Sequence, residues 1–325
     1  MKKIILGILV IILALGSVGC GRKVKSKTDS ELEKQEKKYK SYLNKNVIIS
    51  AKRAKQIIDK GGNISVIDIR KSGDYKEGHI KNAVNVWRPD YESEKYPFGG
   101  MRAEKEKVEK MLGNLGIDSN TFILLYDDKG DYDAARLWWI LDMYGHDKSK
   151  IALIDGGING WKASEFKETK EEPKIIKKEY KFKDKTDESK LATLKEVKEG
   201  IKDPNTIILD TRSIEEFKGD IKLKGAFRKG RIPSSLWIEY KDALNNKEGE
   251  DTTFKNIEEL KKIYKAKGIT KDKKIIVYCQ SAVRSAHTTF VLTQLMGYKN
   301  VKNYDGSWIE WSYNKELPIK TGEDD

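Results

Sequence analysis

The stretch that decides the fold is residues 275–297, which read IIVYCQSAVRSAHTTFVLTQLMG. The first four residues form a short apolar run typical of a buried strand, and Cys279 follows directly. Residues 286–296 have the pattern of a helix, which Gly297 ends. A strand that leads through a short loop into a helix is the repeating unit of a parallel α/β sheet.

The same unit occurs earlier in the chain. Leu125-Tyr126-Asp127 matches Val277-Tyr278-Cys279, and Asp127 precedes Gly145 by 18 residues, as Cys279 precedes Gly297. Further pairs are Asp68-Ile69-Arg70 with Asp210-Thr211-Arg212, Tyr75 with Phe217, Gly78-His79-Ile80 with Gly230-Arg231-Ile232, and Asp155-Gly156 before Trp161 with Asp305-Gly306 before Trp311. An internal repeat of this kind predicts two copies of one domain.

Between these landmarks, strand-like and helix-like runs alternate. The strands are expected at residues 64–69, 122–126, 151–154, 207–209 and 275–278, and two of the helices at 103–115 and 257–267. The sequence therefore predicts an α/β protein of two tandem domains, each a parallel β-sheet flanked by helices. We place the N-terminal domain at residues 46–165, a Lys/Glu-rich linker at 166–190 and the C-terminal domain at 191–325.

The first 20 residues form a separate segment. Lys2 and Lys3 precede an apolar run over residues 4–15, and small residues lead to Cys20. Such a segment is typical of an export signal. It is similar to a bacterial lipoprotein signal, although Ser17 stands where Leu is usual, and that similarity implies lipidation of Cys20 after cleavage. We expect a signal peptide at 1–20, a polar tether at 21–45 and an extracytoplasmic protein anchored to the bacterial cell membrane; an ordinary signal or an uncleaved anchor is the alternative.

The charge of the chain gives a weaker indication. A formal net charge of +13 arises from 64 Lys and Arg against 51 Asp and Glu. Such an excess can indicate a nucleic-acid partner or an anionic membrane surface. Here the lysines are scattered among glutamates, so we interpret them as a solvated surface and expect no nucleic-acid partner.

Cys279 is the candidate nucleophile. If Cys20 carries lipid, Cys279 is the remaining thiol of the two cysteines. A Cys between the carboxyl end of a strand and a helix lies where open α/β sheets bind ligands. Loop N–H groups, the helix N-terminus and Arg284 all favour a thiolate, the form that attacks sulfur. The alternative is a buried structural Cys.

The Cys-x4-Arg-Ser loop, the Asp-x-Arg and Gly-His-Ile elements and the Asp-Gly…Trp ending resemble the rhodanese family, over roughly residues 47–320. The resemblance implies a thiosulfate sulfurtransferase in which Cys279 takes the outer sulfur of thiosulfate as a persulfide and passes it to cyanide or a thiol. It implies a substrate-binding loop and neither a cofactor nor a metal. The loop residues are Gln280, Ser281, Ala282, Val283, Arg284 and Ser285. We expect a monomer.

Three departures from the family pattern bear on activity. Asp127 stands at the nucleophile position of the N-terminal copy, so that copy is expected to be inactive and structural. Glu216 stands where many two-domain members carry a donor-binding Arg, and Arg228 or Arg231 is a possible substitute. The active loop has neither the Arg-Lys pair typical of vertebrate thiosulfate enzymes nor the Gly-Ser-Gly of mercaptopyruvate enzymes, and with Arg284 it resembles bacterial thiosulfate-type loops.

Two other classes of function stay open. A Cys-dependent phosphatase or arsenate reductase has a Cys-x5-Arg loop, which would place Arg at position 285, where this chain has Ser. A non-catalytic, membrane-tethered sulfur carrier or binding module is compatible with Glu216.

Other polar and aromatic residues have simpler interpretations. Asp68, Arg70, Asp210 and Arg212 are expected to form structural ion pairs, and the tryptophans Trp138, Trp139, Trp308 and Trp311 to pack in the core and between the domains. His79, His146 and His287 show no metal-binding spacing, although His287 could support the loop.

Overall fold

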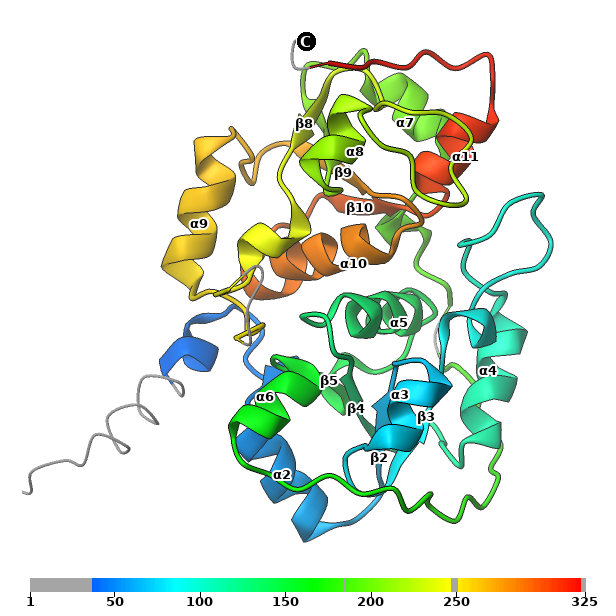
Figure 1. Cartoon of the computed structure of the whole chain (residues 1–325), viewed down its shortest axis with the longest axis vertical. Helices are drawn as coiled ribbons and strands as arrows, with labels where there is room; N and C mark the ends of the chain where they lie inside the picture. The colour runs from blue at the N-terminus through cyan, green and yellow to red at the C-terminus, as the bar shows by residue number, and fades with distance from the viewer. Residues whose placement is uncertain (1–36, 184, 247–250, 323–325) are drawn as a thin grey trace, which may run out of the picture.

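The computed structural model in Figure 1 describes residues 37–183, 185–246 and 251–322. The N-terminal domain holds a parallel five-stranded sheet with the order β1-β5-β4-β2-β3. Its strands are β1 (Ile48–Ile49), β2 (Ile64–Asp68), β3 (Ala83–Asn85), β4 (Phe122–Tyr126) and β5 (Ile151–Ile154). Its helices are α2 (Ala51–Lys60), α3 (Ser72–Glu77), α4 (Lys105–Asn114), α5 (Tyr132–Met143) and α6 (Gly157–Ala163).

The C-terminal domain repeats this arrangement, with the order β6-β10-β9-β7-β8. Its strands are β6 (Leu191–Ala192), β7 (Thr206–Asp210), β8 (Ser235–Trp237), β9 (Lys274–Tyr278) and β10 (Val301–Tyr304). Its helices are α7 (Leu194–Gly200), α8 (Ile214–Lys218), α9 (Ile257–Ala266), α10 (Val283–Phe290), continued by a π-helical turn (Val291–Leu295), and α11 (Ser307–Tyr313). The shared strand order confirms the predicted tandem α/β domains.

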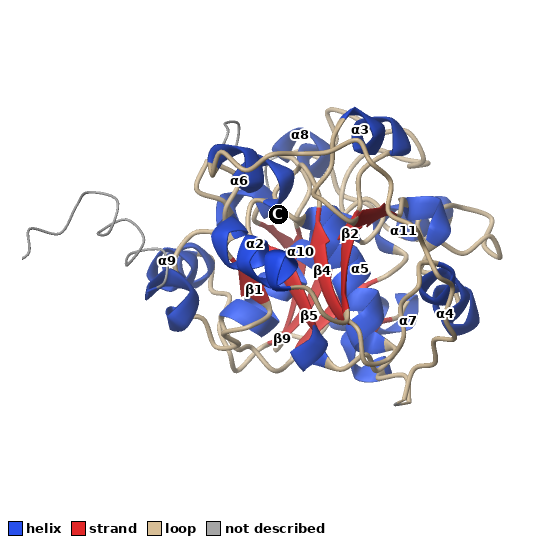
Figure 2. Cartoon of the chain, turned by 90° about the horizontal axis from the view of Figure 1, so that it is seen from below, coloured by secondary structure: helices blue, strands red, loops and turns tan. Residues whose placement is uncertain are grey.

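The central strands of both parallel sheets are apolar on both faces. In β4 and β9 every residue after the first is buried. A strand of this kind needs helices on both faces of its sheet. Figure 2 shows strands lying between layers of helices.

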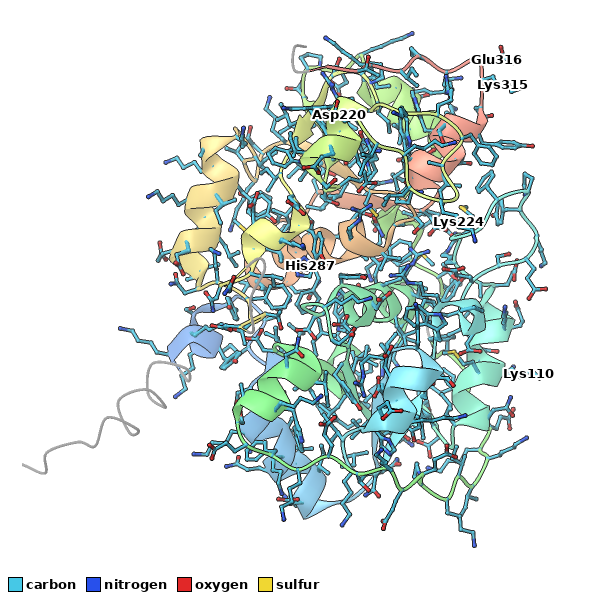
Figure 3. All side chains as sticks on the ribbon, in the orientation of Figure 1. Lys110, Asp220, Lys224, His287, Lys315 and Glu316 are labelled. Carbon is cyan, nitrogen blue, oxygen red and sulfur yellow. The ribbon has the colours of Figure 1, made fainter. Side chains whose placement is uncertain are left out.

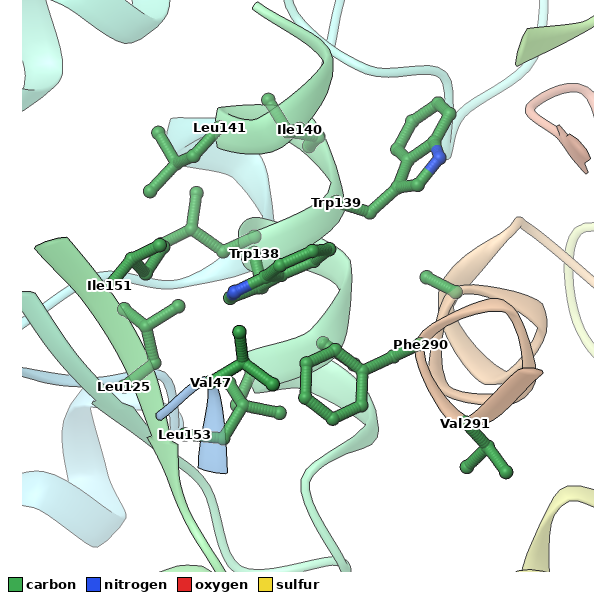
Figure 4. Close-up of a cluster of buried hydrophobic side chains, with 14 of the residues drawn as sticks. Val47, Leu125, Trp138, Trp139, Ile140, Leu141, Ile151, Leu153, Phe290 and Val291 are labelled. Atoms are coloured by element: carbon green, nitrogen blue, oxygen red, sulfur yellow. The ribbon is translucent and has the colours of Figure 1, made fainter. Parts of the chain in front are cut away.

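The two domains meet through α5 and α10, which face each other in Figure 1. Every residue of α5 after Tyr132 is buried, as expected for a helix covered on all sides. The Trp138 ring meets the Phe290 ring edge-on, with 5.1 Å between ring centroids (Figure 4). The predicted packing role of Trp138 is therefore confirmed.

Two segments outside the sheets pack against the domains. The predicted linker, residues 166–190, packs along the surface of the N-terminal domain. There Thr169 pairs with His79, and Tyr180 is buried. The stretch from 37 to 45, predicted as part of the tether, also packs against the protein: Tyr42 is buried and the Leu43 amide donates to the Leu295 carbonyl.

Cys20, the predicted signal peptide and residues 21–36 lie outside the described residues. Within the part of the chain that the structure describes, no helix is both long and apolar enough to cross a bilayer.

Candidate active site

Cys279 begins the loop that joins β9 to α10. The turn into the helix is made at Ala282, whose φ of 58° lies in the left-handed region. A residue other than Gly is uncommon in this region, and such conformations concentrate at functional loops. The geometry places Cys279 at the amino-terminal end of α10, whose first amides have no partner within the helix. The partial positive charge of this helix end favours an anion beside Cys279.

Ser307, at the start of α11, holds the loop in place. Its hydroxyl oxygen accepts from the amides of Cys279 (3.2 Å) and Ala282 (3.0 Å) and donates to the Tyr304 carbonyl (2.7 Å). Sequence reasoning missed this residue. The available signal was a difference between the two repeats, since Gly157 stands where the second copy has Ser307. A Cβ at Gly157 would collide with the Asp127 carbonyl, whereas the second copy has room for a hydroxymethyl group.

The Cys279 side chain is a free thiol at 1% exposure. It lies in the interior of the loop, so only a slender group can reach the sulfur from solvent. This burial excludes a bulky substrate from direct contact with the sulfur.

Arg284 is engaged by an acidic residue. Its guanidinium donates from Nη1 to Glu216 Oε2 (2.6 Å) and from Nη2 to Glu216 Oε1 (3.0 Å), a bidentate pair between α10 and α8. Glu216 is 2% exposed. Burial disfavours the charged guanidinium, but Glu216 and, more weakly, Cys279 raise the pKa of Arg284 above its usual value. The expected anion-binding Arg is thus largely neutralised by its partner.

The two arginines considered as substitutes for Glu216 are also engaged. The Arg228 guanidinium donates to backbone carbonyls around the end of α11, among them those of Asn314 (2.8 Å) and Leu317 (2.9 Å). Arg231 is buried and donates to the carbonyl of Gly322 (2.7 Å). Both side chains therefore tie the C-terminal segment to the domain.

The remaining loop residues connect the site to its surroundings. Gln280 Nε2 donates to the Lys224 carbonyl (3.3 Å), which joins the loop to the segment after α8. Ser281 lies against Gly100 of the N-terminal domain. Ser285 donates to Asn303 of β10 (2.7 Å), and Val283 is buried. The structure therefore brings Gln280 and Ser281 to the edges of the site and turns Ser285 toward the core.

The corresponding loop of the N-terminal copy holds the carboxyl group of Asp127. The Asp127 carboxylate is fully buried and accepts from the backbone amides of Lys129 (2.8 Å), Asp131 (2.9 Å), Asp133 (2.8 Å) and Ala134 (3.1 Å). Burial and the nearby Asp133 raise its pKa to about 7, against the opposing effect of the backbone N–H groups. This loop geometry can thus surround a negative group with N–H donors.

The N-terminal domain also contacts the C-terminal Asp-Gly motif. Asp305 pairs with Arg136 (2.6 Å) and Arg102 (3.1 Å), both from the other domain. Asp305 lies two residues before Ser307, which holds the loop that carries Cys279. The N-terminal copy therefore supports the active loop from outside.

The other predicted structural groups are found where expected. Arg212 is bound to Asp210 and Arg70 to Asp68, each with a closest distance of 2.6 Å. His287 is fully buried, with its ring stacked on Phe254 at 4.8 Å. No cluster of three or more His, Cys, Asp or Glu side chains suited to a metal ion is present among the described residues.

Comparison with known proteins agrees with this geometry. The family model described as Rhodanese-like domain matches residues 50–164 and 193–314. The sulfur carrier protein TtuD of Thermus thermophilus is 37% identical over 260 residues, covering 77% of this chain and 88% of the relative. The thiosulfate sulfurtransferase of Corynebacterium glutamicum is 31% identical over 257 residues, covering 77% of this chain and 82% of the relative.

A similar fold occurs in a solved structure. The anaerobic ergothioneine biosynthesis enzyme of Chlorobium limicola, in complex with trimethyl histidine, has a TM-score of 0.75 and 23% identity, with 87% of this chain and 72% of that chain covered. At this identity the likeness concerns the fold alone.

Proposed function

Since this chain belongs to the rhodanese family, we propose that it is a sulfurtransferase in which Cys279 carries sulfur from thiosulfate to cyanide or a thiol. The Cys279 thiolate attacks the outer sulfur of thiosulfate, the S–S bond breaks, and sulfite leaves with the bonding pair. The acceptor then attacks the outer sulfur of the persulfide. The Cys279 thiolate leaves and is regenerated, so no oxidant or reductant is consumed.

The observation that carries this proposal is the set of backbone N–H groups that bind the Asp127 side chain. Its carboxylate oxygens lie two bonds from Cβ and accept four backbone N–H groups. The outer sulfur of a Cys persulfide also lies two bonds from Cβ and is negatively charged. The N-terminal copy therefore contains a close mimic of the intermediate that we assign to Cys279. A loop of related geometry around Cys279 can hold a persulfide with backbone N–H groups other than that of Ala282, which donates to Ser307.

The pair between Arg284 and Glu216 argues against a phosphatase. A phosphate ester brings two negative charges, and the buried carboxylate of Glu216 lies against the guanidinium that would bind them. The Cys-x4-Arg loop is also one residue shorter than a phosphatase loop. The outer sulfur of a Cys279 persulfide carries a single charge and needs less space than a phosphate ester.

A sulfur carrier without rapid turnover is a second candidate. One relative is named a sulfur carrier protein, and Cys279 is nearly inaccessible. The chemistry at Cys279 is the same in both cases. The two differ in whether a small acceptor regenerates the thiolate at a useful rate.

The test is sulfur loading of the full chain. Incubation with thiosulfate is expected to add one sulfur atom to Cys279, and cyanide to remove it as thiocyanate, with ping-pong kinetics. Cys279→Ser should abolish both steps, while Cys20→Ser serves as the matched control and should retain them. Mass spectrometry reads the adduct. A wild-type chain that takes up no sulfur from thiosulfate contradicts the proposal, and a chain that loads but turns over slowly is the carrier.

We further propose that the chain is a lipoprotein anchored outside the cytoplasm through Cys20. This rests on the sequence of residues 1–20. Cys20→Ser should release the protein from the membrane fraction. Intact-mass measurement of a mature chain with an unmodified Cys20 would disprove lipidation.

A further inference from the structure

The exposed apolar side chains are unevenly distributed. Within the described residues, nine large apolar side chains have exposures above one third. Five of these nine lie on three segments next to the catalytic loop: Tyr96, Ile221, Leu223, Phe227 and Tyr313. Scattered apolar residues need no explanation, but a group of them usually marks an interaction site.

Four aromatic rings form a continuous row across the two domains, which we call the aromatic rim. Tyr96 lies 5.9 Å from Phe98, Phe98 lies 5.4 Å from Tyr313, and Tyr313 lies 5.0 Å from Phe227, measured between ring centroids. The first two rings come from the N-terminal domain. The other two come from α11 and from the segment that follows α8.

The aromatic rim borders the loop that carries Cys279. Gly100, two residues after Phe98, lies against Ser281. The Lys224 carbonyl accepts from Gln280, next to Cys279. Tyr313 ends the helix that Ser307 begins, so about 9 Å of helix separates the rim from the residue that holds the loop. In Figure 1 these three segments meet on the right-hand side, and Figure 3 labels Lys224 there.

The segment beside the rim is strongly basic. Residues 218–231 read KGDIKLKGAFRKGR, with six basic residues against one acidic residue. Three of the six, Arg228, Lys229 and Arg231, donate to backbone carbonyls. Lys222 and Lys224 are exposed and alternate with the exposed Ile221 and Leu223. The surface around the site is therefore both apolar and cationic.

On the basis of the proposed function, we propose that the aromatic rim and residues 218–231 dock an acidic protein that receives sulfur from Cys279. A small thiol would gain little from an apolar surface that spans two domains. Apolar anchors with a complementary charged border are typical of protein–protein recognition. The partner must present its thiol on a slender segment because Cys279 is 1% exposed.

A protein fits this surface better than an anionic bilayer. The N-terminal part of the rim carries Glu94, whose side chain is 95% exposed, beside Tyr96. A protein can place its acidic groups against residues 218–231 and away from Glu94, whereas an anionic bilayer presents the same negative charge to both. The N-terminal described segment, near Lys38, also lies on the opposite side of the molecule in Figure 1.

The transfer itself is a simple displacement. The partner thiolate attacks the outer sulfur of the Cys279 persulfide and forms a new S–S bond. The bond to Cys279 breaks, and its electron pair restores the Cys279 thiolate. The partner leaves as a persulfide, so charge and electrons balance.

The experiment compares short synthetic peptides that carry one Cys with free cysteine as sulfur acceptors for the loaded full chain. One peptide has Leu and Glu around the Cys, a second has Lys in place of Glu, and a third has Ser in place of Leu. We expect the Leu/Glu peptide to exceed the other two in kcat/KM by about tenfold, as for loss of an interface anchor.

Variants then locate the docking surface. Phe227→Ser should lower kcat/KM for the Leu/Glu peptide about tenfold and leave free cysteine within about twofold. Ile176→Ser is the matched control and should change neither rate, since Ile176 is 74% exposed and lies beside Gly116, after α4. Equal rates for the three peptides, or an equal loss for peptide and cysteine in Phe227→Ser, would overturn the proposal.

Hydrogen exchange separates this proposal from the catalytic one. The Leu/Glu peptide should protect residues 218–231 even in a chain that transfers no sulfur, so a failure of catalysis alone is recognisable. Absence of protection overturns the docking proposal. Protection of the same residues by phosphatidylglycerol vesicles, and not by the peptide, would assign the surface to the membrane.

Discussion

At the scale of single residues, Gly100 shows how closely the N-terminal domain approaches the catalytic loop. Its φ of 91° lies in a region that side chains rarely adopt, and an added Cβ would lie 2.6 Å from Ser281 Cβ. A side chain at position 100 therefore requires a shift of Ser281 or of the segment around Gly100. Gly100 is therefore tied to the position of Cys279.

We expect Gly100→Ala to slow sulfur loading of Cys279 by about tenfold or more, because a small displacement of reacting groups has effects of this size. Thiosulfate-dependent loading measured by mass spectrometry gives the rate. Gly99→Ala is the control, because a Cβ there meets no atom within 4 Å. An unchanged loading rate in Gly100→Ala would show that the loop does not depend on this contact.

His287 makes stability depend on pH. Burial lowers its pKa to about 3, against a smaller effect of the Gly130 backbone. The pKa of His287 in the folded protein is lower than in the unfolded chain. The stability that its neutral imidazole contributes is therefore complete above about pH 6.5 and is lost as the pH falls. Between pH 8 and pH 5 the wild type should lose about 2 kcal/mol from this group.

His287→Phe should remove this part of the pH dependence, since Phe does not titrate and can stack on Phe254 in the same place. Urea denaturation at pH 8 and pH 5 measures the free energy of unfolding of both chains. The wild type should lose more stability than the variant. Equal losses of unfolding free energy in the wild type and the variant would mean that His287 takes up a proton in the folded state.

At the scale of elements, the sequence predicted the strands better than the helix ends. Residues 122–126 and 151–154 are β4 and β5 as expected, because a continuous apolar run has sharp limits in a buried parallel strand. The helix expected at 103–115 is α4, which begins at Lys105 because Glu104 is its N-cap. Amphipathic patterns define a helix face more clearly than its ends.

The candidate site was predicted only in part. The position of Cys279 followed from the strand–loop–helix pattern, which is local in sequence. The pairing of Arg284 with Glu216 joins residues 68 positions apart, and the role of Ser307 depends on β10 lying beside β9. Contacts of this kind arise from the tertiary fold, so the pattern around Cys279 could not reveal them.

The loop of the N-terminal copy should depend on its own carboxylate. Asp127→Ala removes the acceptor of four backbone amides, three of which are in buried hydrogen bonds. Unsatisfied buried donors cost about 1–3 kcal/mol each, and water can satisfy some of them. We expect a loss of stability of about 3 kcal/mol with sulfur transfer by the folded protein changed by no more than a few-fold.

Thermal denaturation and the thiosulfate–cyanide assay test these two expectations together. Asp128→Ala is the control, since the side chain of Asp128 is partly exposed. Loss of turnover in Asp127→Ala as complete as in Cys279→Ser would mean that the two copies share one active site.

At the scale of the whole molecule, the two copies form matching contacts. Asp155 in the first Asp-Gly motif pairs with Lys38 (2.6 Å), and Asp305 in the second pairs with Arg136 (2.6 Å). Only the second motif leads to a residue, Ser307, that holds the catalytic loop. The N-terminal domain therefore supports the loop that carries Cys279 through Asp305 and Ser307.

Arg136→Met should both destabilise the protein and slow sulfur loading. Arg136 and Asp305 are almost fully buried, and loss of one partner of a buried pair costs about 3–5 kcal/mol. The matched control is Lys38→Met, which breaks the equivalent pair of the other copy. It should lower the melting temperature without changing the loading rate of the folded protein. Equal slowing by both variants would refute the coupling through Asp305.

The π-helical turn Val291–Leu295 bears on how the loop can change length during evolution. The loop before α5 has one residue more than the loop before α10, yet both loop-and-helix units span 18 residues to their terminal Gly. A π turn accommodates one extra residue in a helix. An insertion in the loop accompanied by loss of the π turn would therefore create a Cys-x5-Arg spacing and leave Gly297 and β10 where they are. A residue gained by the loop can thus be balanced by a residue lost from the helix that follows it, and the sheet does not need to repack.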